Sequence, residues 1–376
     1  MDKYFIRHAL ELSTKGTEML SNPRVGCVIV RDDEIIGSGW HEGRGYAHAE
    51  TAAFHDMQTK GASARGATLY VTLEPCSHFG ITPPCAPRIV EEGVSRVVIG
   101  MLDPNPIING SGIKILKDAG IEVLMMNECG EEGARIEAEC KWLNRGFIRR
   151  VTLKRPWVTI KAAISLDGKI ALADGSSKWI TGVEARTVAH ELRAEHDGIL
   201  VGIGTVLKDD PELTVRNVIG RSPTRVILDT RLNTPENARV LGKGTVIICS
   251  ENICESKLQK KAALIKTGVR VVSVREENGH ISLREALEIL ASDIEIQRLL
   301  VEGGGTVYSS FIEGGFSDAA ALFIAPRFLG QGISITNNLC VNDMEESQNY
   351  SLRIINERRV GDDLLVEGIF KNAPEL

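Results

Sequence analysis

Short apolar runs alternate with helical segments along the whole chain, and this alternation is the feature that most limits its fold. The runs VGCVIV (25–30) and IIGSGW (35–40) predict a hairpin, and ATLYVTL (67–73), RVVIGM (96–101) and IEVLMM (121–126) predict further strands. Helices between apolar strands favour an α/β fold, with a mostly parallel sheet that is covered on both faces. The helices expected in this part span residues 3–15, 48–60, 86–92, 112–119 and 130–144.

The pattern of strands and helices starts again at Trp157, which indicates a second domain. Residues 144–156 are basic and end at a proline, so we place the boundary there, with domains 1–146 and 147–376. A chain of 376 residues suits two cores, since domains usually hold roughly 100–200 residues. Strands are expected over 158–164, 198–204, 225–229, 245–250, 269–274, 298–303 and 318–325 and near the end of the chain, with helices over 183–195, 255–267, 283–292 and 306–313.

The charge balance argues against a dedicated nucleic-acid binder. The 44 Lys and Arg residues against 50 Asp and Glu residues give a net charge of −6, so no basic field is available to hold a phosphate backbone. No apolar run approaches the roughly 20 residues that span a bilayer, and the first 15 residues are typical of an amphipathic helix rather than a signal peptide. We therefore expect a cytoplasmic protein that acts on small molecules without membrane partners, with a homo-oligomer left open.

A group of candidate zinc ligands stands in the first domain. His48, Cys76 and Cys85 are good zinc ligands, and three of them leave a fourth position for water, as in catalytic zinc sites. The pattern places His48 and Cys76 at the starts of helices, where the helix dipole favours a thiolate. Glu50 stands two residues after His48, where its carboxylate can exchange protons with a water molecule on the metal. These residues predict a zinc-dependent hydrolase of the nucleobase deaminase type.

Two other interpretations stay open at this point. The same ligands could hold a structural zinc ion in a non-catalytic binding module, but this leaves Glu50 without a role, and no fourth ligand is evident. His48, Cys76 and Cys85 could also be unrelated buried residues, although their joint occurrence with Glu50 argues against this. Cys27 lies in an alternating apolar strand and is expected in the core.

Four segments of the first domain together resemble a known family. They are SNPRVG (21–26), HAE (48–50), TLEPCSHFGITPPC (72–85) and DPNPIINGSG (103–112), and they are similar to the deaminase domain of the bifunctional deaminase/reductase family of riboflavin biosynthesis. Eight residues separate the two cysteines, where most zinc deaminases have two, and this long insert distinguishes the family. The resemblance implies a cytidine-deaminase-like α/β/α domain that hydrolyses the 2-amino group of 2,5-diamino-6-(5-phosphoribosylamino)pyrimidin-4(3H)-one.

The resemblance also implies roles for single residues of this domain. Asn22, His41 and His78 would contact the pyrimidine and the ribose phosphate, beside the zinc ligands and the catalytic glutamate. Two positions depart from the family pattern, since Ile81 and Ser111 stand where the family usually carries a basic residue. The absence of a basic side chain at Ile81 predicts weaker phosphate binding with unchanged chemistry.

The second domain carries glycine-rich segments that suit a nucleotide. Residues 202–204 read G-x-G, and EGGGT (302–306) stands between a predicted strand and a predicted helix, where backbone N–H groups can approach a phosphate. A G-x-G alone is a weak signal, and a glycine-rich turn is the plain alternative for 302–306. Six segments in order resemble the reductase domain of the same family: KAAISLDGKIA (161–171), SSKWITG (176–182), GIGTVLKDDPELTVR (202–216), RVILD (225–229), VEGGGT (301–306) and IAPRFLG (324–330).

This second resemblance implies a dihydrofolate-reductase-like α/β domain that uses NADPH to reduce the ribosyl chain of 5-amino-6-(5-phosphoribosylamino)uracil to ribityl. The whole chain is then a bifunctional hydrolase and oxidoreductase with Zn²⁺ and NADPH as cofactors. An alternative is a zinc deaminase of another nucleobase whose second half is a non-reducing substrate domain. By the resemblance, NADPH would contact Ala163, Trp179, Thr205, Asp209, Gly303, Gly304 and Gly305, and the substrate would contact Ser177, Arg193, Leu213, Arg216 and Glu302. The two arginines could clamp a phosphate, and the plain alternative for Trp179 is a core anchor.

Overall fold

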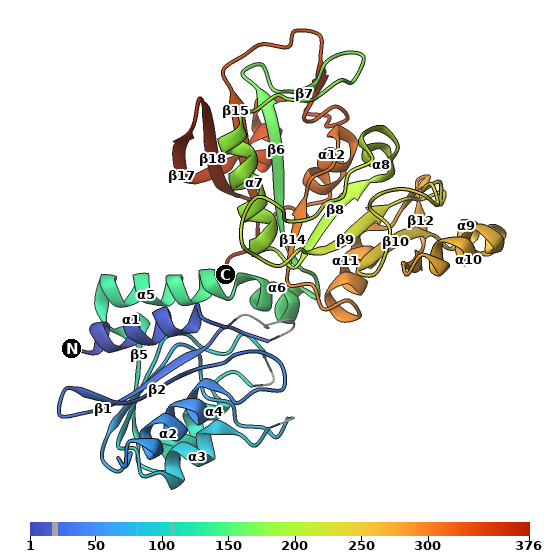
Figure 1. Cartoon of the computed structure of the whole chain (residues 1–376). Helices are drawn as coiled ribbons and strands as arrows, with labels where there is room; N and C mark the ends of the chain where they lie inside the picture. The colour runs from blue at the N-terminus through green and yellow to red at the C-terminus, as the bar shows by residue number, and fades with distance from the viewer. Residues whose placement is uncertain (17–21, 81, 107) are drawn as a thin grey trace. The chain divides into compact units, whose positions relative to one another are not determined.

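The computed structural model of the chain divides into two compact units, Met1–Lys154 and Arg155–Glu375 (Figure 1). The sequence pattern placed this boundary earlier, between residues 146 and 147, in the basic segment that ends at Pro156. That segment contains a helix, α6 (Arg145–Leu153), and it belongs to the first unit because Ile148 is buried in the core of that unit. The structure describes residues 1–16, 22–80, 82–106 and 108–376.

A five-stranded sheet forms the centre of the first unit, in the order β2-β1-β3-β4-β5. The strands are β1 (Gly26–Arg31), β2 (Glu34–Trp40), β3 (Thr68–Val71), β4 (Arg96–Ile99) and β5 (Glu122–Met125), and the helices are α1 (Asp2–Ser13), α2 (Ala49–Thr59), α3 (Cys85–Glu91), α4 (Ser111–Asp118), α5 (Gly130–Leu143) and the short η1 (Met126–Glu128). The expected hairpin forms between β1 and β2, β1 also pairs antiparallel with β3, and β3, β4 and β5 are parallel. Each predicted strand and helix of this part is therefore present, but the sheet is mixed rather than mostly parallel, because the hairpin strand β1 is antiparallel to both of its neighbours.

Two glycines let helices approach the sheet closely. A Cβ on Gly26 would lie 1.9 Å from the carbonyl oxygen of Ala9 in α1, and a Cβ on Gly39 would lie 2.4 Å from the backbone nitrogen of Ala53 in α2. Gly39 pairs with Cys27, the neighbour of Gly26, and successive strand residues point to opposite faces. Helices α1 and α2 therefore cover opposite faces, which gives the expected α/β/α layers (Figure 1).

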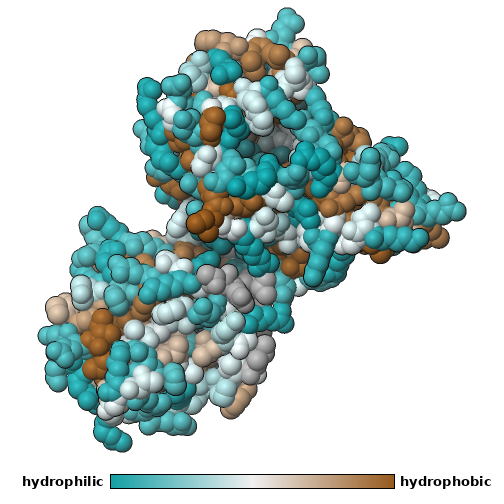
Figure 2. Space-filling view, viewed as in Figure 1, coloured by the Kyte–Doolittle hydropathy of each residue, from teal (hydrophilic) through white to brown (hydrophobic). Residues whose placement is uncertain are grey.

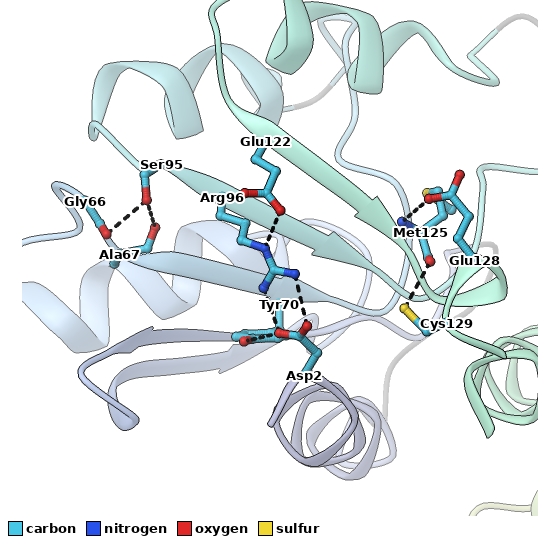
Figure 3. A network of polar contacts seen from close by, with 10 residues as sticks. All are labelled: Asp2, Gly66, Ala67, Tyr70, Ser95, Arg96, Glu122, Met125, Glu128 and Cys129. Carbon is cyan, nitrogen blue, oxygen red and sulfur yellow. Dashed lines mark hydrogen bonds and ion pairs between the residues drawn. The ribbon is translucent and has the colours of Figure 1, made fainter.

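A polar network fixes the first turn of α1 to the sheet (Figure 3). Arg96 donates from Nη1 and Nη2 to the two carboxylate oxygens of Asp2 at 2.7 and 3.0 Å, and its Nε donates to Glu122 at 2.9 Å. The hydroxyl of Tyr70 donates to Asp2 Oδ1 at 2.8 Å. The hydrogen bonds from Arg96 lower the pKa of Asp2, so this residue is a carboxylate in the folded protein at neutral pH.

A nine-stranded sheet forms the centre of the second unit, in the order β11-β10-β9-β8-β14-β6-β15-β18-β17. The strands are β6 (Trp157–Ser165), β8 (Gly198–Gly202), β9 (Thr224–Leu228), β10 (Thr245–Ser250), β11 (Arg270–Val274), β14 (Arg298–Val301), β15 (Ala319–Ala325), β17 (Leu352–Val360) and β18 (Asp363–Phe370), with small ladders between β7 (Lys169–Ala171) and β16 (Ile333–Ser334) and between β12 (Glu276–Glu277) and β13 (His280–Ile281). Neighbours from β11 to β15 are parallel, and β18 and β17 are antiparallel. The mostly parallel sheet is confirmed.

Helices cover both faces of this sheet. Leu300 of β14 packs in one core cluster with Leu192, whereas its neighbours Leu299 and Val301 pack in another with Phe311. Because successive strand residues alternate between faces, the helices that carry Leu192 and Phe311 lie on opposite faces. The helices of this unit are α7 (Val183–Glu195), α8 (Ile203–Asp209), α9 (Glu251–Ser256), α10 (Leu258–Lys266), α11 (Leu283–Ser292), α12 (Gly305–Glu313), α13 (Met344–Ser347) and the short η2 (Gln348–Tyr350).

Two expectations for the second unit were wrong in detail. The helix expected over 255–267 is two helices, α9 and α10, because the backbone at Lys257 leaves the helical region, with φ −108° and ψ 45°. The strand expected over 198–204 ends at Gly202, since α8 begins at the next residue.

The visible surface of both units is mostly hydrophilic. Figure 2 shows polar and charged residues spread over this face, with hydrophobic residues in separate small groups. Charged residues make up 25% of the sequence, which is the usual share for a globular protein. Among the described residues, no helix combines the length and the apolar character needed to cross a membrane.

Candidate active sites

The three predicted zinc ligands come together in the first unit. His48 Nδ1 lies 3.5 Å from Cys76 Sγ and 3.3 Å from Cys85 Sγ, and the three ligand atoms all lie within 4.8 Å of one another. Zinc bonds of about 2.0–2.3 Å at tetrahedral angles separate nitrogen and sulfur ligands by about 3.5 Å. The donor set and its spacing therefore fit one zinc ion with three protein ligands.

Different elements hold the three ligands. His48 directly precedes α2, and Cys85 is the first residue of α3. The expectation that Cys76 starts a helix is wrong, because it lies in the loop after β3. The start of α3 nevertheless stabilises the Cys76 thiolate, because the Cys85 N–H donates to Cys76 Sγ at 3.3 Å. Hydrogen bonds from Cys85 and His48 hold the pKa of Cys76 well below its usual range, which favours the thiolate that binds a metal.

Glu50 lies in the first turn of α2, buried beside the ligands. Its side chain is 4% exposed and forms a hydrogen bond with Cys85. Burial, followed by the negative charge of Cys76, raises the pKa of Glu50 to about 7. A carboxyl group with a pKa near neutrality can both accept and return a proton.

Of the three residues expected to contact the substrate, His41 lies beside the zinc ligand His48, and Asn22 contacts His41. His41 Nε2 is 2.8 Å from Asn22 Nδ2, and His41 Nδ1 is 2.9 Å from the carbonyl oxygen of Ala47. These partners assign the proton of a neutral ring to Nδ1, and burial lowers the pKa of His41 in agreement. The ring lies at 82° to the His48 ring, with centroids 5.5 Å apart. His78 is exposed on the loop that follows Cys76.

The two departures from the family pattern fall on different parts of the structure. Ile81 lies outside the described residues. Ser111 begins α4, and its Oγ is 2.6 Å from Ser77 Oγ. A hydroxyl pair therefore occupies the place next to Cys76 where a basic side chain was expected.

In the second unit, all twelve predicted contact residues line one cavity. Its volume is about 1110 Å³, which is ample for a ligand larger than a drug-sized molecule. The cavity lies where the carboxyl ends of β6, β14, β8 and β9 meet, the usual place for ligands in open α/β sheets. The predicted residues on its wall are Ala163, Ser177, Trp179, Arg193, Thr205, Asp209, Leu213, Arg216, Glu302, Gly303, Gly304 and Gly305.

A buried ionic cluster marks one end of this cavity. Arg193 donates from Nε and Nη2 to the two oxygens of Glu302 at 2.8 and 2.9 Å, and Lys161 Nζ lies 3.5 Å from Glu302 Oε2. Burial alone would raise the pKa of Glu302, but Arg193 and Lys161 hold it at about 2. Glu302 is therefore ionised, and its orientation is fixed by two cations on α7 and β6.

The glycines after Glu302 form a cradle at the start of α12. A Cβ on Gly305 would lie 2.7 Å from the carbonyl oxygen of Ser334, and one on Gly303 would lie 2.7 Å from the Cβ of Val307. Only glycine allows this close packing, which leaves the backbone N–H groups at the start of α12 facing the cavity wall. The segment fits a phosphate group of a nucleotide cofactor.

The two arginines expected to clamp a phosphate differ in their partners. Arg193 is committed to Glu302, and its Nη1 donates to the carbonyl oxygen of Thr214 at 3.2 Å. Arg216 is exposed, and its Nη1 donates to Glu212 at 2.6 Å. Trp179 is 65% exposed at the cavity rather than a core anchor, and the guanidinium of Arg186 lies 4.4 Å from its ring centroid. The expected clamp thus has one exposed guanidinium, that of Arg216.

Sequence reasoning missed Lys161 and His190, which also line the cavity. Lys161 stands inside the quoted segment 161–171, but the pattern gave no reason to single it out. His190 accepts the backbone N–H of Arg216 on Nδ1 at 3.3 Å, and burial lowers its pKa. Alternation in β6 places Lys161 and Ala163 on the same face, which is the signal that could have found Lys161.

Comparisons with known proteins match both units. A family model described as the cytidine and deoxycytidylate deaminase zinc-binding region matches residues 1–101, and the RibD C-terminal domain matches residues 156–366. The riboflavin biosynthesis protein RibD of Aquifex aeolicus is 42% identical over 372 residues, which cover 97% of this chain and 98% of the relative. RibD of Escherichia coli is 37% identical over 349 residues, which cover 88% of this chain and 89% of the relative.

Solved structures match over the same extent. Acinetobacter baumannii RibD has a TM-score of 0.84 at 35% identity, with 98% of this chain and 99% of that chain covered. The Thermotoga maritima diaminohydroxyphosphoribosylaminopyrimidine deaminase/5-amino-6-(5-phosphoribosylamino)uracil reductase has a TM-score of 0.82 at 36% identity, with 98% of each chain covered. A match through both units does not favour a deaminase of another base with a non-reducing second half. The chain belongs to the RibD family of riboflavin biosynthesis, in which a zinc-binding deaminase domain and a reductase domain share one polypeptide.

Proposed function

We propose that the first unit hydrolyses the 2-amino group of 2,5-diamino-6-(5-phosphoribosylamino)pyrimidin-4(3H)-one. We further propose that the second unit reduces the ribosyl chain of the resulting 5-amino-6-(5-phosphoribosylamino)uracil to ribityl with NADPH, in the cytoplasm. The observation that carries the first step is Glu50, a buried carboxyl with a pKa near 7 beside a three-ligand zinc set. Bound Zn²⁺ would supply a Lewis acid that makes water a better nucleophile.

Glu50 moves the proton in this hydrolysis. It takes a proton from the attacking water on one carboxylate oxygen and delivers it to the departing amino nitrogen. A C–O bond forms at the ring carbon, the C–N bond breaks, and ammonia leaves. Asn22 and His41, held 2.8 Å apart, orient the pyrimidine edge, and the exposed His78 reaches toward the ribose phosphate.

In the second unit, the ionised Glu302 orients the amino-pyrimidine. Lys161 and Arg193 fix this carboxylate, and Arg216 supplies the exposed cation for the substrate phosphate, with Ser177 and Leu213 on the same wall. The nicotinamide cofactor, when bound, supplies the hydride. We assign its ring to Ala163 and Trp179, and its phosphates to the cradle at Gly303–Gly305 with Thr205 and Asp209.

Arg231, which lines the cavity beside the end of β9, supports NADPH over NADH. We assign the nicotinamide end to the side of the ionic cluster at β6 and β14 and the pyrophosphate to the cradle after β14, so the adenosine end would extend over β8 and β9. Thr230 and Arg231 line the cavity directly after β9. Within the described residues, the Arg231 guanidinium has no hydrogen-bond acceptor or ion-pair partner. A free guanidinium at the adenosine end suits the additional 2′-phosphate of NADPH.

This cofactor assignment has a direct test. Replacing Arg231 with alanine should lower the ratio of kcat/KM for NADPH to that for NADH by about tenfold, the equivalent of one exposed charge-assisted contact. Arg239→Ala is the matched control, because Arg239 also lines the cavity but is paired with Glu212. An unchanged ratio in the Arg231 variant contradicts the assignment.

Ammonia release from the diaminopyrimidine substrate, followed by NADPH oxidation in the same reaction, tests the proposed function as a whole. We expect ammonia without NADPH present and NADPH oxidation only after ammonia has formed. Deamination of cytidine or deoxycytidylate in place of the diaminopyrimidine would contradict the proposed substrate.

A further inference from the structure

A buried carboxylate next to the zinc ligands has no part in the roles assigned so far. Glu74 follows β3, two residues before Cys76, and is 3% exposed. A buried polar side chain requires hydrogen-bond partners. Its two oxygens accept four backbone N–H groups, with Oε1 accepting from Gly112 at 3.0 Å and Ile113 at 3.3 Å, and Oε2 accepting from Gly110 at 3.0 Å and Asp103 at 3.3 Å.

Three of the four donors, Gly110, Gly112 and Ile113, lie at the start of α4, and the fourth, Asp103, lies shortly after β4. Gly112 and Ile113 are first-turn residues of α4, and their N–H groups have no acceptor inside the helix. A carboxylate at this position also interacts favourably with the helix dipole. Glu74 therefore supplies the acceptors that this loop and this helix start lack.

The two segments are packed against each other on both sides of Cys76. A Cβ on Gly112 would lie 2.0 Å from the carbonyl oxygen of Pro75, so the backbones are in direct contact before Cys76. After it, the hydroxyls of Ser77 and Ser111 lie 2.6 Å apart. The start of α4 therefore contacts the chain on both sides of Cys76, while the start of α3 holds Cys76 itself through the N–H groups of Cys85 and Ala86.

We propose that Glu74 is a positioning residue for the zinc site. By accepting four N–H groups, it fixes the Pro75–Cys76 segment against α4 and holds Cys76 Sγ at the distance from His48 Nδ1 that zinc requires. The inference rests on the zinc role proposed above, and it is independent of which pyrimidine is the substrate.

Glu74→Gln tests this role with little change in shape. The amide nitrogen cannot accept a hydrogen bond, so one pair of N–H donors loses its acceptor. Loss of a group that supports metal ligands typically costs 10–100-fold in metal affinity or activity. We expect zinc to pass to a chelator 10–100-fold faster than from the wild type. Deaminase kcat should fall more than KM changes, and NADPH oxidation by the second unit should stay at the wild-type rate.

Asp56→Asn is the matched control. Asp56 lies on α2 in the same unit and accepts the backbone N–H of Ser38 at 2.8 Å and the Ser38 hydroxyl at 3.2 Å. This variant should lower the melting temperature without changing zinc release. If Glu74→Gln also retains zinc at the wild-type rate, Glu74 is a purely structural residue and the inference is overturned. Absence of zinc from the wild-type protein would overturn the proposed function together with the inference.

A second variant separates positioning from folding if Glu74→Gln does not fold. In Gly112→Ala, the new Cβ forces the Pro75 carbonyl away while Glu74 remains intact. We expect the same faster zinc release, and a changed thiolate charge-transfer spectrum in the cobalt-substituted protein. A folded Gly112→Ala protein with the wild-type cobalt spectrum and zinc release would refute the proposed coupling.

Discussion

Replacing Glu302 with glutamine should destabilise the second unit by about 3 kcal/mol at neutral pH. The pKa of Glu302 falls from an ordinary 4.5 to about 2 in the folded protein, and each pKa unit corresponds to about 1.4 kcal/mol. The shift of roughly 2.5 units gives the expected value, which agrees with the ~3–5 kcal/mol measured when one partner of a buried pair is removed. The variant leaves Arg193 and Lys161 as buried cations without their carboxylate.

The lowered pKa of Glu302 also determines how the stability of the second unit depends on pH. A carboxyl whose pKa is lower in the folded than in the unfolded state stabilises the fold above the unfolded value, and this contribution is lost as the pH falls through the folded value. The difference between wild type and Glu302→Gln should therefore be constant above about pH 4.5 and shrink between about pH 4.5 and pH 2.

Hydrogen exchange in increasing urea can measure the free energy of unfolding of each unit separately. Peptides from β14 and α7 report the second unit, and peptides from the first unit serve as an internal reference. Glu285→Gln is the control, because Glu285 in the same unit pairs with Arg275 at the surface, where such pairs contribute about 0–1 kcal/mol. A loss below ~1 kcal/mol in Glu302→Gln, equal to the control, would refute the argument that burial makes this pair strong.

Three further changes test the first unit. Glu50→Gln should reduce ammonia release by about 10²–10⁴-fold, the usual contribution of proton transfer, and leave NADPH oxidation of the deaminated substrate intact. Equal loss of both activities in a folded variant contradicts two separate sites. Cys85→Ser should lower the zinc content of the purified protein strongly, and zinc equal to wild type would remove Cys85 from the ligand set. Asp2→Asn should lower the free energy of unfolding by about 1 kcal/mol at neutral pH, since its partner Arg96 is partly exposed. Denaturation curves should show this loss shrinking as the pH falls below 3.8 and Asp2 protonates. A loss that stays constant there contradicts the assignment.

The cavity of the second unit could be predicted because parallel strands bring their carboxyl ends to one edge. Glu302 and its glycines follow β14, and Thr205 lies just after β8, so a polar or glycine-rich segment after each apolar run was a sufficient signal. The zinc ligands could be predicted for a different reason. Cys and His are the residue types that bind zinc, and the joint occurrence of His48 and Glu50 with Cys76 and Cys85 singled out two of the eight cysteines.

Three other features depend on contacts or exposure that the sequence pattern does not indicate. Glu74 accepts backbone N–H groups, which nearly every residue carries, from a segment about 30 residues away, so its partners leave no sequence pattern. The segment 145–153 is basic and resembles a linker, but burial of Ile148 makes it part of the first core. Strand β17 is exposed on both faces except near its ends, so it lacks the alternating pattern by which strands are recognised.

Three buried glutamates show how surroundings assign different tasks to one side chain. Glu74 accepts hydrogen bonds from four backbone N–H groups and contacts no cation among the described residues. These hydrogen bonds fix both the side chain of Glu74 and the backbone of its partners. Glu302 meets two cations, which keep its pKa at about 2, so it remains an anion that can orient a ligand but cannot exchange protons near neutral pH. Burial and a neighbouring thiolate disfavour the ionised form of Glu50, and its pKa rises to about 7. Between Glu50 and Glu302, the structure gives proton transfer to Glu50, because desolvation and nearby charge disfavour its ionised form whereas two cations stabilise that of Glu302.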